Sequence, residues 1–248
     1  MRMMDGPFAG YRAVLFDLDG VLTDTAGIHA GCWKQVFDDY LRARAARTGA
    51  PCVEFDIARD YYDYVDGKPR YDGVRSFLAS RDIVLPDGDP SDPPGTGTVC
   101  ALGNRKNALV KQALARGGIE PYPDALRLLE RLAGSGLRLA VVSSSKNTPA
   151  VLDAAGLAAR FDTVVDGAVA AAAGLAGKPA PDTFIEAGRR VGVAPGQAVV
   201  VEDAIAGVEA GRNGRFGLVV GVARSGNADA LAAAGADLVV ADLDELAG

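Results

Sequence analysis

Two aspartates, Asp17 and Asp19, follow the apolar run 13–16 with a single residue between them. Ionised carboxylates at this spacing repel each other, and placing them at the end of a buried strand is costly unless something compensates. A cation, a shared proton or a reaction at one carboxylate is the usual compensation. The spacing alone is weak evidence, because Asp-x-Asp recurs at 87–89 and 242–244, where we interpret it as a solvated acidic turn.

Polar clusters follow three more apolar runs of the chain. They are Ser143, Ser144, Ser145, Lys146 and Asn147 after the run 137–142, Lys178 after the run 161–165 and an intervening loop, and Glu202 with Asp203 after the run 197–201. Ligands of an open parallel sheet bind beyond the carboxyl ends of its strands, so these clusters are expected to converge on Asp17 and Asp19. Carboxylates from two strands suit a hard divalent ion such as Mg²⁺. Ser143 and Lys178 would then hold the oxygens of a phosphoryl group.

Each cluster taken singly has a simpler explanation. Lys178 could be a solvated loop lysine, and Ser143 could be the N-cap of a helix. Glu202 and Asp203 could stabilise a helix dipole from its first turn. All of them together, each at the end of a predicted strand, favour a phosphoryl-transfer site.

The elements that must position these residues form an alternating pattern. Short, continuously apolar runs rich in valine alternate with helical patterns from residue 118 to the end of the chain. Continuous rather than alternating hydrophobicity is typical of strands buried on both faces. We therefore predict an α/β fold with a Rossmann-like parallel sheet, to which the run 13–16 contributes the first strand.

A mainly helical insertion is predicted at residues 27–117, leaving 1–26 and 118–248 as the core. Trp33, Val36, Phe37, Tyr40 and Leu41 form the apolar stripe of an amphipathic helix. Two more helical patterns follow, and the segment 86–97, rich in proline and glycine, is expected to be a surface loop.

The composition excludes several classes of function. A net charge of −6 argues against binding to nucleic acid or to an anionic membrane surface. Cys32, Cys52 and Cys100 have no paired spacing, which argues against a zinc site or a disulfide framework. With neither a signal sequence nor a long apolar segment in view, we expect a cytoplasmic protein, and we expect it to be a monomer.

Four motifs together resemble those of the haloacid dehalogenase-like superfamily. They are Asp17-Leu-Asp19-Gly20-Val21, Ser143, Lys178-Pro179 and Glu202-Asp203. The resemblance implies a Rossmann-like core with a helical cap inserted after the first strand. It implies that Asp17 is a nucleophile forming an aspartyl-phosphate, and that Asp19, oriented by Thr25, is the general acid and base. Mg²⁺ would be held by Asp17, the main-chain carbonyl of Asp19 and Asp203, with Glu202 as a ligand or a partner of the ligands.

Longer segments resemble the β-phosphoglucomutase family, including DLDGVLTDTAGIHAGCWK, GKPR, SSSKN and GKPAPDTF. The resemblance implies interconversion of β-glucose 1-phosphate and glucose 6-phosphate through a bound 1,6-bisphosphate, which requires two phosphate sites. Mg²⁺, Ser143, Ser144 and Lys178 would form one site, and Arg70 with Ser145, Lys146 and Asn147 the other. The remaining substrate-binding residues implied are His29, Trp33, Gly67, Lys68 and Lys106.

Two other functions stay open from the sequence. The same core residues under a cap that excludes water less completely would make a sugar-phosphate phosphatase. A non-catalytic module that keeps the fold is the other possibility, although the presence of Asp17, Asp19, Lys178 and Asp203 argues against it.

Overall fold

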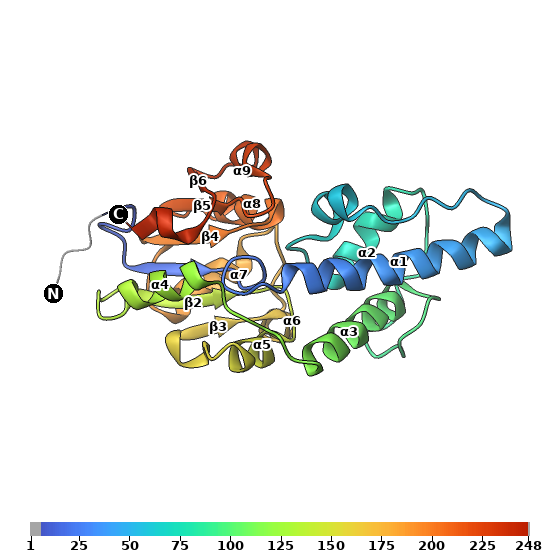
Figure 1. Cartoon of the computed structure of the whole chain (residues 1–248), viewed down its shortest axis with the longest axis horizontal. Helices are drawn as coiled ribbons and strands as arrows, with labels where there is room; N and C mark the ends of the chain where they lie inside the picture. Colours follow the sequence, from blue (N-terminus) through green and yellow to red (C-terminus); the bar gives the residue numbers. More distant parts are fainter. Residues whose placement is uncertain (1–5, 248) are drawn as a thin grey trace. The chain divides into compact units, whose positions relative to one another are not determined.

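A computed structural model of the chain describes residues 6–247 and divides the protein into two compact units (Figure 1). The core unit comprises the chain up to Asp24 and from Ile119 onward, and the insert unit comprises Thr25–Gly118. Each unit has its own hydrophobic cluster. The helical insertion predicted at 27–117 lies within the insert unit.

The core unit is built on a parallel sheet of six strands in the order β3-β2-β1-β4-β5-β6. The strands are β1 (Ala13–Phe16), β2 (Arg138–Val142), β3 (Thr163–Val165), β4 (Ala198–Glu202), β5 (Leu218–Val222) and β6 (Leu238–Val240). All four residues of β1 are fully buried, which explains its continuously apolar sequence. The predicted α/β fold with a Rossmann-like parallel sheet and a helical insertion is confirmed.

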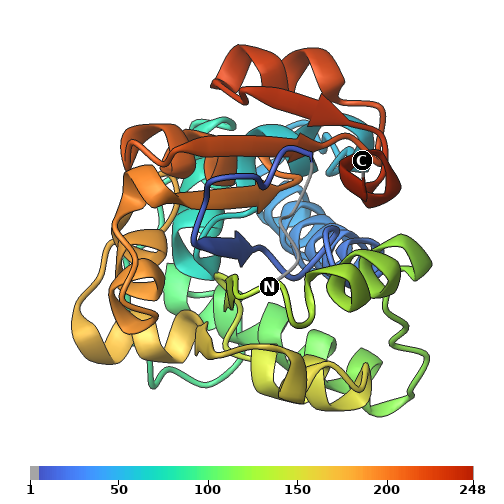
Figure 2. The same ribbon diagram turned by 90° about the vertical axis from the view of Figure 1, so that its left-hand side faces the viewer.

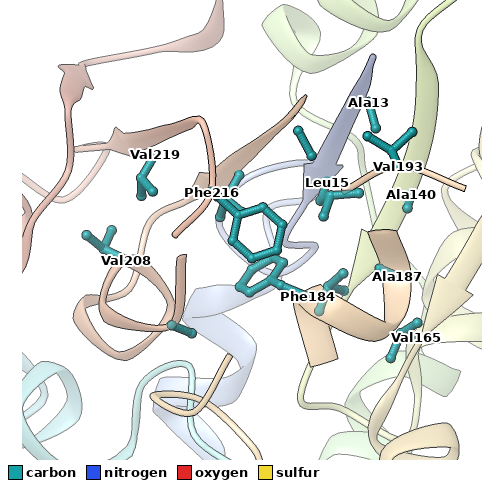
Figure 3. Packing of buried hydrophobic residues seen from close by; sticks show 14 of the residues in the cluster. Ala13, Leu15, Ala140, Val165, Phe184, Ala187, Val193, Val208, Phe216 and Val219 are labelled. Atoms are coloured by element: carbon teal, nitrogen blue, oxygen red, sulfur yellow. The ribbon is translucent and has the colours of Figure 1, made fainter. Parts of the chain in front are cut away.

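Helices cover both faces of this sheet (Figure 2). They are α4 (Pro123–Leu132), α5 (Thr148–Ala154), α6 (Gly167–Ala173), α7 (Asp182–Arg190), α8 (Ile205–Asn213) and α9 (Ala228–Ala234), with 3₁₀ turns at Ala158–Arg160, Pro195–Gln197 and Leu243–Ala247. On one face, Phe184 of α7 and Phe216 meet edge to face with their ring centroids 6.0 Å apart (Figure 3). Ala13 and Leu15 of the central strand belong to the same cluster, so packing of α7 fixes the strand that precedes Asp17.

The expectation of a plain loop between β3 and Lys178 is wrong, because this segment contains α6. Alanine has the strongest helix propensity of the residues. The Asp166 side chain caps the helix by accepting hydrogen bonds from the main-chain N–H groups of Ala168 and Val169. An N-cap aspartate followed by a run of alanines is therefore the pattern in the sequence that indicates this helix.

The insert unit is helical. It consists of α1 (Ala26–Thr48), the π-helix η1 (Ile57–Val65), α2 (Arg70–Ala79) and α3 (Val99–Ala115). The predicted stripe of α1 is buried, and it packs on Phe55, Phe77 and their neighbours. The π-helix was not predicted. Residues 86–97 form a largely exposed loop, as expected, and the Asn104 side chain donates hydrogen bonds to the carbonyls of Pro90 and Asp92 within it.

Within the described part of the chain, no helix combines the length and the apolar character needed to cross a lipid bilayer.

Candidate functional site

Three neighbouring strands bring the predicted chemical groups to one edge of the sheet. Phe16, the last residue of β1, is in register with Val141 of β2 and Val201 of β4. Asp17 follows Phe16 directly, and its main-chain N–H donates to the carbonyl of Val201 over 2.9 Å. Asp17 and Glu202, the next residues along β1 and β4, therefore lie at the same level of the sheet, and Ser143 follows one residue further along β2.

A buried lysine joins two of these strands. The Lys178 ammonium donates to Oδ1 of Asp17 over 2.5 Å, to Oε1 of Glu202, and to the carbonyl of Val142 over 3.2 Å. Its side chain is 1% exposed, and those of Asp17 and Glu202 are 9% and 0% exposed. The interpretation of Lys178 as a solvated loop lysine is therefore wrong, and one ammonium faces two buried carboxylates.

The charge states in this cluster depend on one another. Burial raises the pKa of Asp17 well above its usual value, the Lys178 charge lowers it, and the neighbouring carboxylates of Glu202 and Asp19 raise it again. Burial alone would lower the pKa of Lys178, but the charges of Asp17 and Glu202 raise it above its usual value. Lys178 therefore stays protonated, and further positive charge at this site would favour the ionised form of Asp17.

Glu202 is held on both of its oxygens. While Oε1 accepts from Lys178, Oε2 accepts from the main-chain N–H groups of Asp203 and Ala204, each over 3.0 Å. Gly207 in α8 makes room for this carboxylate, because a Cβ there would lie 1.9 Å from Oε1. The geometry makes Glu202 the residue that fixes Lys178 and the loop after β4. The ligand role considered for it stays a prediction.

The donor set fits a hard divalent cation. Asp17, Glu202 and Asp203 each offer a carboxylate oxygen, and these atoms lie within 4.8 Å of one another. Oxygen ligands of this kind suit Mg²⁺. Gly20 leaves the space that the Asp203 carboxylate occupies, since a Cβ on Gly20 would lie 1.9 Å from Asp203 Oδ2.

Gly20→Ala is expected to displace the Asp203 carboxylate. Gly20 also has φ +93°, which side chains rarely adopt, so we expect a stability loss of about 1–3 kcal/mol in addition to weaker Mg²⁺ binding. Urea unfolding and a Mg²⁺ titration measure the two effects. Gly10→Ala is the matched control, because Gly10 has φ +85° with nothing within 4 Å of its added Cβ. Equal losses of Mg²⁺ affinity in both variants would contradict the role of the Asp203 contact.

The loop after β2 is organised by its own serines. The Ser143 hydroxyl accepts from the main-chain N–H of Ser145 over 3.1 Å and donates to Oδ2 of Asp19 over 3.4 Å. Ser145 Oγ accepts from the N–H of Asn147 in turn. Ser144 and Ser145 are half-buried, and Lys146 is exposed. The structure thus brings Ser143 to Asp19, as predicted from their places after neighbouring strands.

A second polar cluster lies in the insert unit. The Lys106 ammonium is 2.8 Å from Nδ1 of His29 and 4.8 Å from the centroid of the Trp33 ring. An ammonium has donors only, so His29 Nδ1 must accept in this contact. Trp33 stacks on Phe37 with ring centroids 5.1 Å apart, so this tryptophan belongs to the insert core as well as to the polar cluster. The structure brings together His29, Trp33 and Lys106, which the sequence assigned to one group.

The remaining predicted residues of the insert unit occupy the starts of helices and the turn before α2. Thr25 precedes α1, without a capping hydrogen bond from its side chain, and Gly67 adopts φ +69°. Lys68 Nζ donates to Ser76 Oγ over 3.0 Å. Arg70 begins α2, and its guanidinium donates to the Tyr71 hydroxyl over 3.1 Å.

Sequence reasoning missed one part of the core site. Arg224 and Asn227, in the segment that follows β5, contact the main chain of the loops after β1 and β4. Neither residue belongs to a motif singled out from the sequence. The position of Arg224 could have indicated its role, because it stands two residues beyond the carboxyl end of a predicted strand, where ligands of a parallel sheet bind.

The fold and this site define a class of enzyme. A family model described as haloacid dehalogenase-like hydrolase matches residues 11–215. The chain therefore belongs to the haloacid dehalogenase-like hydrolases, and the prediction of an enzyme is confirmed.

Relatives make the assignment narrower. A protein of Mycobacterium tuberculosis called β-phosphoglucomutase is 52% identical over 95% of this chain and 91% of its own length. Another M. tuberculosis protein, called an uncharacterized glycosyl hydrolase, is 41% identical over 94% of this chain but only 17% of its own length. The crystal structure of a Clostridium difficile β-phosphoglucomutase matches with a TM-score of 0.71 at 23% identity, covering 95% of this chain and 93% of that one, which supports the fold. The predicted resemblance to the β-phosphoglucomutases is thereby confirmed.

Proposed function

We propose that the protein is a Mg²⁺-dependent β-phosphoglucomutase, which interconverts β-glucose 1-phosphate and glucose 6-phosphate through an aspartyl-phosphate and a bound 1,6-bisphosphate. The observation that carries this proposal is the 52% identity, over nearly the whole chain, to a protein called β-phosphoglucomutase. The geometry of the core unit supports the phosphoryl-transfer part of it.

Asp17 is the proposed nucleophile. Its carboxylate attacks the phosphorus of a bound sugar phosphate, the bond from phosphorus to the sugar oxygen breaks, and an aspartyl-phosphate forms. Lys178 supports this step, because its fixed positive charge holds Asp17 in place and is positioned to stabilise the oxygens of the transferred group. When bound, Mg²⁺, held by Asp17, Asp203 and the main-chain carbonyl of Asp19, would supply further positive charge for those oxygens.

Asp19 is the proposed general acid and base. It gives a proton to the sugar oxygen as that oxygen leaves and takes a proton from the hydroxyl that attacks the aspartyl-phosphate. The hydrogen bond from Ser143 Oγ to Asp19 Oδ2 supports this assignment, since it orients the Asp19 carboxyl group independently of Asp17. We propose that Thr25 contributes to the same orientation.

Two phosphate sites are needed for a mutase, because the 1,6-bisphosphate must present each end to Asp17 in turn. We assign the second site to Arg70 together with Ser145, Lys146 and Asn147. An arginine can hold a phosphate with two parallel hydrogen bonds. His29, Trp33, Gly67, Lys68 and Lys106 are assigned to the sugar.

The second candidate is a sugar-phosphate phosphatase, in which water attacks the aspartyl-phosphate. It is favoured by the match to a family described as hydrolases. The core residues would act in the same way in both enzymes, and only the acceptor of the phosphoryl group would differ.

An assay with β-glucose 1-phosphate, Mg²⁺ and a trace of the 1,6-bisphosphate separates the two candidates. We expect glucose 6-phosphate, measured through its oxidation by a dehydrogenase, with little inorganic phosphate. Stoichiometric inorganic phosphate without glucose 6-phosphate would instead establish the phosphatase.

Arg70→Ala is expected to lower the mutase rate by about 10²-fold or more, because one bidentate phosphate contact is lost and the intermediate is no longer oriented. Hydrolysis of a simple phosphate ester, which needs the core site only, should fall much less. The control is Arg75→Ala, since Arg75 lies in the same helix α2 but pairs with Asp72 and Asp87. Equal losses of both activities in Arg70→Ala would refute the assignment of Arg70 to the second phosphate.

A further inference from the structure

The segment 223–227, between β5 and α9, contacts both loops that carry the proposed metal ligands. Arg224 reaches the loop after β1, and Asn227 reaches the loop after β4. These contacts lie entirely within the core unit. They are made to main-chain carbonyls, so they fix the paths of the two loops independently of the side chains there.

Arg224 makes three hydrogen bonds with one guanidinium. Nε donates to the carbonyl of Gly20 over 3.0 Å, and Nη2 donates to the carbonyl of Val21 over 3.2 Å and to Asp124 Oδ2 over 2.7 Å. Gly20 follows Asp19 directly, so this contact constrains the turn that sets the direction of the Asp19 carbonyl. The planar group of arginine, whose five donors point in fixed directions, suits three acceptors that lie at different positions around it.

Arg224 is itself held in place from two sides. Its guanidinium lies over the Tyr122 ring, 3.8 Å from the ring centroid. Asp124, its ionic partner, is nearly buried and also accepts from the main-chain N–H of Leu243 over 2.7 Å. A cation stacked on an aromatic ring and paired with a fixed carboxylate has little freedom to move, so the two carbonyls are held by a rigid group.

Asn227 completes the arrangement on the other loop. Its Nδ2 donates to the carbonyl of Asp203 over 3.1 Å. The same residue precedes α9, which packs on β5 and β6. One short segment, anchored on the sheet, thus holds the main chain at Asp203 and at Gly20.

We propose that Arg224 and Asn227 are positioning residues for the Mg²⁺ site, setting the spacing between the loop that carries Asp17 and Asp19 and the loop that carries Asp203. The inference rests on the proposed Mg²⁺-dependent function. Partners of this kind, which orient ligands without touching the metal, change metal affinity by about 10- to 100-fold when they are removed.

The test is Mg²⁺ binding by isothermal titration calorimetry to the full chain, without any sugar. Arg224→Ala is expected to weaken binding by about 10-fold or more, and Asn227→Ala by a smaller factor. Arg127→Ala is the matched control. Arg127 lies on α4, the helix that carries Asp124, and its exposed guanidinium makes two hydrogen bonds to Asp244 rather than to the β1 loop.

A second readout separates positioning from general stability. Hydrolysis of a simple phosphate ester by Arg224→Ala should recover most of its kcat at saturating Mg²⁺, whereas a merely unstable enzyme would not recover. If Arg224→Ala does not fold, Arg224→Lys keeps the positive charge but cannot hold both carbonyls and Asp124, and it should show an intermediate loss of Mg²⁺ affinity.

Unchanged Mg²⁺ affinity in Arg224→Ala, or in Arg224→Lys if only that variant folds, would overturn the inference. A loss of Mg²⁺ affinity in the Arg224 variant equal to that in Arg127→Ala would overturn it as well. Mg²⁺ binding is measured without substrate. A negative mutase assay would therefore refute the proposed function without changing what the Mg²⁺ affinities say about Arg224.

Discussion

Asp17→Asn is expected to abolish both mutase and phosphatase activity, with a loss on the order of 10⁴-fold or more, since both reactions pass through the same aspartyl-phosphate. The amide is nearly the same size as the carboxyl group, and its oxygen can still accept the hydrogen bond from Lys178. The loss should therefore come from missing nucleophilicity rather than from unfolding.

The measurement is initial rate with β-glucose 1-phosphate and with a simple phosphate ester, together with mass spectrometry of acid-quenched enzyme. A covalent phosphate on Asp17 is expected in the natural protein and absent in Asp17→Asn. Activity that survives in Asp17→Asn would show that another residue is the nucleophile. Asp244→Asn is a suitable control, because Asp244 belongs to the Asp-x-Asp pattern at 242–244 and forms an exposed ion pair with Arg127.

Lys178→Met is expected to be both inactive and destabilised. The substitution leaves Asp17 and Glu202 buried without the ammonium that lies between them. Removing one partner of a buried ionic cluster costs about 3–5 kcal/mol. Urea unfolding of the metal-free protein, in the presence of a chelator, measures this loss directly.

The loss in Lys178→Met should depend on pH in a defined direction. Burial raises the pKa of Asp17 in the folded state, and without Lys178 the pKa rises further. Ionising a group with a raised folded-state pKa destabilises the fold. The contribution of Asp17 to the free energy of unfolding is therefore fully present below its unfolded-state pKa of about 3.9, and it is lost as the pH rises through the folded-state pKa. The difference in free energy of unfolding between Lys178→Met and the natural protein should therefore increase from pH 4.5 to pH 7.5.

The double variant Lys178→Met/Glu202→Gln is the test of that explanation. It removes one of the two negative charges left behind and should regain part of the lost stability at pH 7.5. A double variant no more stable than Lys178→Met would contradict charge imbalance as the cause.

The strands could be predicted from the sequence because each is buried on both faces and therefore continuously apolar. The run 13–16 is the clearest example, with every residue fully buried in the central strand. The π-helix Ile57–Val65 could not be predicted, because its hydrogen bonds do not follow the period of 3.6 residues on which helix prediction depends. The helix α6 was missed because its alanines form no apolar stripe that stands out from a small-residue loop.

The core site could be predicted as far as its residues stand directly after strands or in a motif. Asp17, Ser143 and Glu202 are of this kind. Lys178 could be named, but its burial between two carboxylates could not be read from the sequence, because it depends on how α7 packs on the sheet. Arg224 was missed because its partners in the loop after β1 are main-chain carbonyls about 200 positions away, and such contacts place no requirement on the residue type of the partner.

The pairing of β1 with β2 and β4 has a consequence for the order of folding events. Ser143 is 124 residues from Asp19 in the sequence, and Lys178 is 161 residues from Asp17. Contacts over such distances close large loops and form slowly, whereas the helical insertion between β1 and β2 is built from nearer neighbours in the chain. The catalytic cluster should therefore be among the last parts to assemble during refolding. Until it does, the chain would hold Asp17 and Glu202 in solvent, where their charges cost little.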